Sequence, residues 1–497
     1  MICKNCCCPR FTTLHIYAYT IDICTILWGI RRMRAGKAVF RTISFLLVLA
    51  FAIWAIPQSI FGMDNSAVYF RAKDFYKEKN EALDAVFVGA SNVYAFWQPA
   101  IGWQARGIAV YNLAFGSLPF TAVDHLIAEA RRTQPNALYI INLSTFKTNS
   151  EISSIENYHR VVDYMPFTLE KIRFIHKIAG DSGFSLADEM ELLFPFIRFH
   201  SRWNRLESWC YGAQEGRYKE SLSKSGFEDV VDIGDKIDIY ADERDDLNKN
   251  AMEAFTDLLD YLDREHVNAL FVKVPQATRS VHQGRMNVME DMVTSRGYPC
   301  LDMLSGYEEV GIIPQRDFFN RYHTNIRGSS KLTRYLADYL VEHYHFTDKR
   351  GQADYADWDR EAEAYDKFVD TWILPFEREK ILWQDLPAPK IKEAKAKRSG
   401  IRLTWSASKG ADGYVIYRKT AVEDDGHWKL VATVGTDKLS YVDSELQKNT
   451  KYTYVIAPFV DKGGQKAYGN YNIKGASCTS PKELGQSSAR EKTPGQG

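Results

Sequence analysis

Short apolar runs alternate with amphipathic stretches between residues 82 and 346. Four runs of β-branched, aromatic and other apolar residues are bounded by turn residues: Ala85–Gly89 (AVFVG), Ile108–Ala114 (IAVYNLA), Ala137–Leu143 (ALYIINL) and Asn268–Val274 (NALFVKV). Between them, stretches such as Thr121–Arg132 and Asn250–Glu265 repeat apolar residues at helical spacing. Continuous apolar strands separated by helices predict an α/β domain whose parallel sheet is covered on both faces.

A different pattern begins near residue 387 and ends near residue 481. The runs IRLTWSA, GYVIYRK, WKLVATV, LSYVD and KYTYVIAPF are short, alternating or β-branched, and separated by turn residues, which predicts an all-β sandwich. Trp405 lies on an early strand. Leu446 and Tyr452 have the spacing at which a tyrosine hydroxyl bonds back to the backbone at a sandwich corner. This part resembles a fibronectin type III domain, which implies a spacer or an adhesive module.

The remaining segments differ from these two domains in amino-acid composition. Residues 150–250 are rich in aromatics and histidines and predict a helical insertion in the α/β domain. Residues 347–386 are acidic and aromatic, which predicts a helical linker. Residues 482–497 are polar and rich in glycine and serine, which predicts a disordered tail.

An uncharged apolar run covers Thr42–Met63. A bilayer-spanning helix needs about 20 apolar residues, so the run predicts a single membrane anchor. Arg31, Arg32, Arg34, Lys37 and Arg41 precede it without an acid among them, which predicts that residues 1–41 are cytoplasmic and the later domains extracytoplasmic. The weakly apolar stretch at residues 15–30 is either a second span or an interfacial helix, and the orientation is the same in both cases.

Composition narrows the function classes. The 497 residues carry 63 Lys+Arg and 63 Asp+Glu, so there is no basic excess, and we do not expect nucleic acid as a partner. The cysteines outside the N-terminal region are too few for a disulfide framework. The sequence contains no P-loop, no GxGxxG, no HExxH and no paired metal ligands, and predicts no cofactor and no metal.

Three loops of the α/β domain carry candidate chemistry, because ligands of parallel sheets bind beyond the carboxyl ends of the strands. In VFVGASNVYAF, Ser91 follows a buried strand and starts a helix, where backbone N–H groups favour a developing anion. In NLAFGS, Gly116 ends a strand and permits close backbone approach. In DFFNRYHTNIRG, His323 lies a few residues before an amphipathic helix.

These motifs, in this order, resemble the SGNH (GDSL-like) hydrolase superfamily, and in particular its membrane-anchored envelope members in Gram-positive bacteria, such as the protein for D-alanylation of teichoic acids. The resemblance covers about half of the chain. It implies a flavodoxin-like three-layer fold, with Ser91 as nucleophile and His323 as general base. The backbone N–H groups of Ser91 and Gly116 are then the expected oxyanion donors.

Two positions depart from the family's pattern. The family contributes an Asn donor after the third strand, and here IINLSTF offers Asn142 or, as the other candidate, Ser144. The family places an Asp three residues before the histidine, and this chain has Asn320. An amide oxygen still accepts the imidazole N–H, although it stabilises an imidazolium less well than a carboxylate does. Asp317 is an alternative partner if the loop bends.

The implied reaction is acyl transfer from an ester, to water in a hydrolase or to a sugar or polyol hydroxyl in an acyltransferase. An extracytoplasmic site implies a cell-envelope polysaccharide or teichoic acid as substrate, and other envelope-modification proteins as partners. The alternative is a catalytically inactive anchored scaffold that binds glycan or protein, and Asn320 favours it. The two hypotheses differ in whether Ser91 and His323 meet.

Overall fold

The computed structural model describes residues 37–59, 72, 74–147, 153–199, 233–378, 381–420, 427–472 and 474–482. The chain divides into two compact units, one of Met1–Asn65 with Pro195–Glu215 and the other of Ser66–Phe194 with Gly216–Gly497. The first unit contains α2 (Lys37–Ser59) and α10 (Pro195–Phe199). The second contains the α/β domain, the linker and the sandwich.

Helix α2 covers the predicted anchor of residues 42–63 as far as Ser59. Residues 60–63, the stretch at 15–30 and the N-terminal cysteines lie outside the described residues. In the part of the chain that the structure describes, no helix combines the length and the apolar character needed to cross a membrane.

The α/β domain is built on a sheet of five parallel strands in the order β2-β1-β3-β4-β5. The predicted parallel sheet is therefore confirmed. Its strands are β1 (Ala85–Gly89), β2 (Val110–Ala114), β3 (Leu138–Asn142), β4 (Ala269–Lys273) and β5 (Cys300–Asp302). The chain adds β2 on one side of β1 and then β3 on the other, so the order reverses at β1. Such a switch point is where ligands bind in open α/β sheets.

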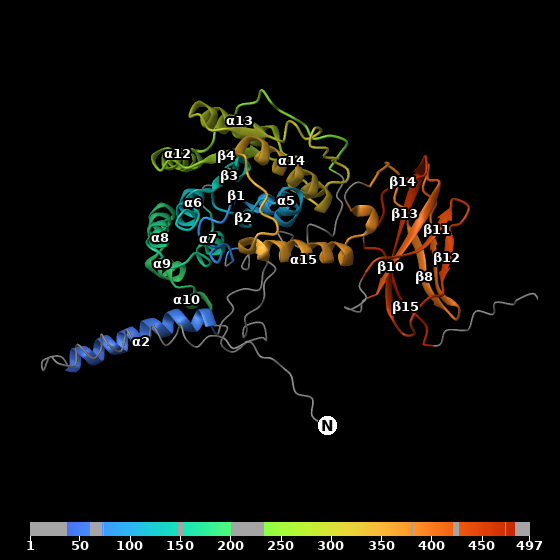
Figure 1. Ribbon diagram of the computed structural model, residues 1–497, viewed down its shortest axis with the longest axis horizontal. Coiled ribbons are helices and arrows are strands. Elements are labelled where there is room, and N and C mark those ends of the chain that lie inside the picture. The colour runs from blue at the N-terminus through green and yellow to red at the C-terminus, as the bar shows by residue number, and fades with distance from the viewer. Residues whose placement is uncertain are drawn as a thin grey trace, which may run out of the picture. The chain divides into compact units, whose positions relative to one another are not determined.

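Helices cover this sheet in two groups. Figure 1 shows the strands between α6 and α12 on one side and α5 and α14 on the other. The helices and 3-10 turns of the domain are α4 (Ser91–Phe96), α5 (Pro99–Arg106), η1 (Phe120–Ala122), α6 (Val123–Ala130), η2 (Leu143–Thr145), α12 (Lys249–Arg264), α13 (Ser280–Ser295) and α14 (Ile326–Tyr344). Helices α7 (Ile155–Val162), α8 (Leu169–Ser182) and α9 (Leu186–Leu193) lie in the first part of the segment predicted as an insertion.

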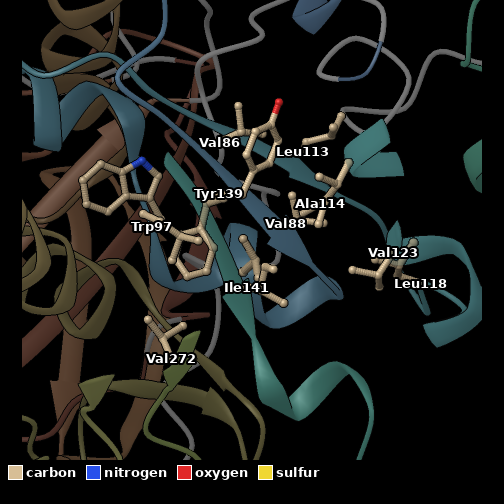
Figure 2. Close-up of a cluster of buried hydrophobic side chains, with 14 of the residues drawn as sticks. Val86, Val88, Trp97, Leu113, Ala114, Leu118, Val123, Tyr139, Ile141 and Val272 are labelled. Carbon is tan, nitrogen blue, oxygen red and sulfur yellow. The ribbon is translucent and has the colours of Figure 1, made fainter. Parts of the chain in front are cut away.

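Strand residues on both faces of the sheet are buried, which explains why the strands read as continuous apolar runs. On one face, Phe87 of β1 and Ile140 of β3 are buried. On the other face, Val86 and Val88 of β1 are fully buried, as are Tyr139 and Ile141 of β3. Figure 2 shows these side chains packed with Val272 of β4 and with residues that follow β1 and β2. This core holds the carboxyl ends of β1 and β3 side by side.

The linker contains η5 (Ala353–Tyr355), α15 (Ala356–Trp372) and η6 (Pro375–Glu377). The C-terminal part is a sandwich of two antiparallel sheets, β12-β9-β8 and β11-β10-β13-β14, with β15 also paired to β13. Its strands are β8 (Ile391–Lys397), β9 (Gly400–Trp405), β10 (Gly413–Thr420), β11 (Lys429–Gly435), β12 (Ser440–Asp443), β13 (Lys451–Lys462), β14 (Gln465–Tyr468) and β15 (Ala476–Thr479).

The two sandwich landmarks expected from the sequence are present. The indole of Trp405 is buried and packs edge-on against Tyr414 of β10. The hydroxyl of Tyr452 accepts a hydrogen bond from the backbone N–H of Gln447 at 2.8 Å, which is the predicted corner contact. The all-β sandwich is confirmed, and the predicted tail beyond residue 482 lies outside the described residues.

Candidate active site

Ser91 is placed by a tight turn between β1 and α4. It is the first residue of α4, where a helical N–H has no acceptor within the helix. The turn depends on Gly89, because a Cβ at that position would lie 2.6 Å from Cγ2 of Val93. The N–H of Ala90 donates to Oγ1 of Thr145 at 3.3 Å and ties the turn to the end of β3. The serine hydroxyl is thus held at the switch point of the sheet.

His323 is carried by a short hairpin of β6 (Phe318–Asn320) and β7 (His323–Thr324). The hydroxyl of Thr324 donates to the backbone oxygen of Ala95 at 2.7 Å, which fixes β7 against α4. Asn325 then caps α14 by accepting from the N–H groups of Arg327 and Gly328. The hairpin is therefore fixed at both ends, to the helix of Ser91 and to α14.

The two side chains meet, although they are 232 positions apart. Oγ of Ser91 lies 2.7 Å from Nε2 of His323, and Nδ1 of His323 lies 2.9 Å from Oδ1 of Asn320. The N–H of Tyr322 also donates to that Oδ1 at 2.9 Å, which identifies the atom as the amide oxygen. Nδ1 of His323 therefore carries the proton, and Nε2 is free to accept the proton of the Ser91 hydroxyl.

Asn320, and not Asp317, occupies the position behind the imidazole. The carboxylate of Asp317 is buried and accepts from the N–H of Ile313 at 2.7 Å and from Nζ of Lys331 at 2.6 Å. It also faces Arg327 at 3.8 Å. The loop bend that would bring Asp317 to His323 does not occur, because these contacts use the carboxylate to anchor the start of the hairpin.

The imidazole lies in an apolar and positively charged setting. Its ring stacks on Phe319, with centroids 5.2 Å apart. Burial, and after it the charge of Lys147, lower the pKa of His323 from its usual 6.5 to about 4. His323 is therefore neutral at physiological pH, which is the state a general base requires. The amide of Asn320 adds no negative charge that would raise this pKa.

The expected oxyanion donors lie around the same turn. Packing does not require a glycine at position 116. An added Cβ would lie 3.7 Å from Tyr94 and 3.8 Å from Arg160, which are ordinary contact distances. Its backbone oxygen accepts from Nη1 of Arg160 at 3.1 Å. The space beside Gly116 is therefore compatible with the close approach of a substrate.

Asn142 and Ser144 are distinguished by their partners. The hydroxyl of Ser144 accepts a short hydrogen bond from Nδ2 of Asn92. Oδ1 of Asn142 accepts from the N–H of Ser144 at 3.1 Å, whereas its Nδ2 is buried and has no partner among the described residues. Asn142 is thus the side chain that retains an unused donor at the end of β3.

The sequence reasoning did not identify Lys147, Gln276 and Tyr322 as neighbours of this site. Nζ of Lys147 donates to Oε1 of Gln276 and lies 5.2 Å from the centroid of the Tyr322 ring. Their positions in the sequence could have indicated them, because Lys147 follows the carboxyl end of β3 and Gln276 follows that of β4. Within the described ranges, no group of three or more His, Cys, Asp or Glu side chains is arranged to hold a metal ion.

Comparisons with known proteins find similarity only to solved structures, and the three described below match about a fifth of the chain. No family model matches the chain, and no curated protein matches it. Among solved structures, a Fn3-like protein from Clostridium thermocellum is 26% identical over 21% of this chain and 100% of its own, with a TM-score of 0.16. FN3tt mut is 26% identical over 20% of this chain and 99% of its own, with a TM-score of 0.15.

A third similar structure is that of a much longer protein. A β-1,2-glucanase from Parabacteroides distasonis is 23% identical over 20% of this chain, with a TM-score of 0.16, and the match spans only 13% of the glucanase. These similarities cover about a fifth of the chain. The strand pairing described above is what makes the C-terminal part a fibronectin type III-like sandwich.

Proposed function

We propose that the chain is an acyl-ester hydrolase or O-acyltransferase of the SGNH type that acts on a cell-envelope glycopolymer. The observation that carries the proposal is the contact of 2.7 Å between Oγ of Ser91 and Nε2 of His323. The strand order β2-β1-β3-β4-β5 also supports it, because it is the order of flavodoxin-like sheets, in which the switch point holds the ligand.

The proposed reaction consists of proton transfers between Ser91, His323 and the ester. Nε2 of His323 takes the proton of Ser91 as Oγ attacks the carbonyl carbon of the ester. The oxyanion faces the N–H groups of Ser91 and Gly116, and the side chain of Asn142 supplies a further donor. His323 then returns its proton to the departing alcohol, which leaves an acyl group on Ser91. A water or a sugar hydroxyl releases that acyl group by the reverse steps.

The proposed location is the outer face of the cell membrane, with residues 42–63 as the anchor. The support is the uncharged run and the basic cluster that precedes it. Protease treatment of intact protoplasts should cleave the α/β domain and the sandwich from the full-length chain. If both remain protected until the membrane is lysed, the proposed orientation is wrong.

A fluorophosphonate probe tests the nucleophile directly, because it reacts only with an activated serine. The wild-type chain should be labelled, Ser91→Ala should not, and His323→Ala should react at least tenfold more slowly. Ser117 lies on a neighbouring loop, so Ser117→Ala is the matched control and should label like the wild type. Equal labelling of wild type and Ser91→Ala would exclude Ser91 as the nucleophile.

The second candidate is an anchored scaffold without catalysis. It is favoured by one observation, the neutral Asn320 behind His323. In a serine protease, an amide in place of the triad carboxylate lowers kcat about 10⁴-fold because the imidazole takes the wrong tautomer. Here the amide oxygen holds the correct tautomer, so the loss is limited to the carboxylate's charge. A wild-type chain that is not labelled by the probe, and that binds envelope glycopolymer without removing acyl groups from it, would establish the scaffold.

A further inference from the structure

A buried ammonium group lies beside the Ser91–His323 pair. Lys147 is only 8% exposed, and burial lowers its pKa to about 7. Its charge acts on His323, and its Nζ lies over the ring of Tyr322, the residue that precedes the histidine. Burying a charge is costly unless an opposite charge or several hydrogen bonds compensate for it.

The described residues supply no opposite charge in contact with Lys147. None of the described carboxylates forms an ion pair with Lys147, and its one side-chain hydrogen bond goes to the neutral amide of Gln276. Burial lowers the pKa of the nearby His282, and the charges of Lys147, Arg285 and Arg279 lower it further. Lys147 is thus a buried cation without an ion-pair partner among the described residues.

Three more polar groups around Lys147 are buried and unused. Nε2 of Gln276, Oγ1 of Thr278 and Nδ1 of His282 have no hydrogen-bond partner in the described part of the chain. Gln276 is fully buried, and Thr278 is 7% exposed. Leaving a buried polar atom unsatisfied is costly, so several in one place indicate a ligand that satisfies them.

These groups belong to the same corner of the domain as the catalytic hairpin. The N–H of Ala277 donates to the backbone oxygen of Arg321 at 2.8 Å, which joins the loop after β4 to the hairpin of His323. Nη1 of Arg285 donates to the backbone oxygen of Lys147 at 3.0 Å and fixes the loop after β3 to α13. The cluster is thus built from three rigidly connected segments.

We infer that Lys147, Gln276, Thr278 and His282 form a subsite for an anionic group of the substrate, placed next to the ester that Ser91 attacks. The inference rests on the proposed function and specifies its substrate class: acyl esters of a molecule that carries a phosphate or a carboxylate. A phosphate or a carboxylate accepts the hydrogen bonds that these groups offer, and its negative charge pairs with Lys147. A neutral sugar accepts hydrogen bonds but supplies no charge.

Three matched acetyl esters test the inference: O-acetylglycerol, O-acetylglycerol phosphate and the acetyl ester of glycerate. With the wild-type chain, kcat/KM for one or both charged esters should exceed that of the neutral ester at least tenfold. Lys147→Gln should lower the charged-to-neutral ratio at least tenfold, and Lys147→Arg by threefold or less. Which charged ester is preferred decides between phosphate and carboxylate.

Other outcomes contradict the inference. An unchanged ratio in Lys147→Gln excludes an anion subsite, and an equal fall for all three esters places Lys147 in the catalytic step instead. Thr278→Val replaces a hydroxyl by a methyl group of the same shape and should lower the ratio about threefold, which keeps the test available if Lys147→Gln does not fold. Lys171→Gln, which removes a buried lysine of α8, is the matched control and should leave the ratio unchanged.

A binding measurement separates this inference from the proposed function. Calorimetric titration of Ser91→Ala with inorganic phosphate and with acetate should show binding that is lost in Ser91→Ala/Lys147→Gln. If the anions bind but no ester is cleaved by the wild type, the subsite stands and the enzymatic proposal fails. If esters are cleaved with no preference for charge and no anion binds, the enzymatic proposal stands and the subsite is excluded.

Discussion

The amide oxygen of Asn320 accepts a hydrogen bond from Nδ1 of His323 at 2.9 Å, so the tautomer of the imidazole is fixed without a carboxylate. The same oxygen accepts from the N–H of Tyr322 at 2.9 Å, which prevents the amide from turning its nitrogen toward the ring. Orientation and charge stabilisation, which one Asp provides in a Ser-His-Asp triad, are separated here, and only orientation is present.

Restoring the carboxylate should therefore raise activity. Asn320→Asp keeps both hydrogen bonds and adds a negative charge that stabilises the imidazolium as it forms. We expect kcat on an acetyl ester to rise at least tenfold, within the roughly 10⁴-fold limit set by the converse change in a serine protease. Asn320→Ala loses the acceptor and should fall below the wild type, and the order Asp, Asn, Ala is measured by steady-state kinetics. A wild type faster than Asn320→Asp would contradict this reading of the site.

The pH dependence of kcat/KM should reflect the lowered pKa of His323. In the proposed mechanism His323 is the base, and burial, with a smaller contribution from Lys147, lowers its pKa to about 4. Because the neutral form is active, kcat/KM for a neutral acetyl ester should be constant above pH 5 and should fall as pH decreases through about 4. Lys147→Met removes the smaller cause and should move this limb upward, but not as far as 6.5, because burial remains. NMR titration of the imidazole resonances measures the same pKa directly, and a limb near 6.5 in the wild type would be inconsistent with the burial.

Two glycines that flank the site should respond differently to a methyl group. In Gly89→Ala the new Cβ lies 2.6 Å from Val93, so the variant should lose about 1–3 kcal/mol of the free energy of unfolding. Gly116→Ala meets only ordinary contacts and should stay within about 0.5 kcal/mol of the wild type. Its methyl group crowds the expected oxyanion position and should lower kcat/KM at least about tenfold. Urea unfolding and ester kinetics on both variants provide the comparison, and a destabilised Gly116→Ala would show that packing requires this glycine.

A buried ion-pair network should make the hairpin dependent on the linker. Glu377 of η6 pairs with Arg327 at 2.6 Å and with Arg316 at 3.3 Å, and all three side chains are buried. Glu377→Gln removes the carboxylate that Arg316 and Arg327 share and leaves Arg327 only its longer contact with Asp317. The variant should lower the free energy of unfolding by about 3 kcal/mol. Asp354→Asn breaks the exposed pair with Lys79 and, as a control, should leave the free energy of unfolding nearly unchanged.

Urea denaturation of the two variants measures these costs. The activity of Glu377→Gln at low temperature should fall as well, because Arg316 precedes Asp317 and the hairpin directly. A variant as stable and as active as the control would show that the network is not needed to hold His323 in place.

The sequence predicted the two fold classes because each leaves a local signal. The runs at residues 85–89, 110–114 and 138–142 are apolar on both faces, which only a covered sheet requires. The corner contact of Tyr452 is equally local, since donor and acceptor are five positions apart. Strand β5 was not predicted, because its three residues are half-buried and include Asp302, so it lacks the apolar run that marked the others.

The candidate site was predictable only in part. Ser91 and His323 belong to motifs that can be recognised, and the choice between Asn320 and Asp317 was not decided because both lie within reach along the chain. The structure shows that Asn320 is the partner, because the hairpin pairs Asn320 with His323 while Asp317 turns toward Lys331. Lys147 could not be found from sequence, because its importance comes from burial and from the absence of a described acid beside it, and neither property is local.

The two halves of the site are synthesised far apart in time. The turn of Ser91 emerges early in translation, whereas the hairpin that holds His323 emerges more than two hundred residues later and must still be fixed to α4 through Thr324. A partly synthesised chain therefore presents a serine without its base. Under the proposed mechanism, such a nascent chain does not yet activate Ser91 for attack on an ester.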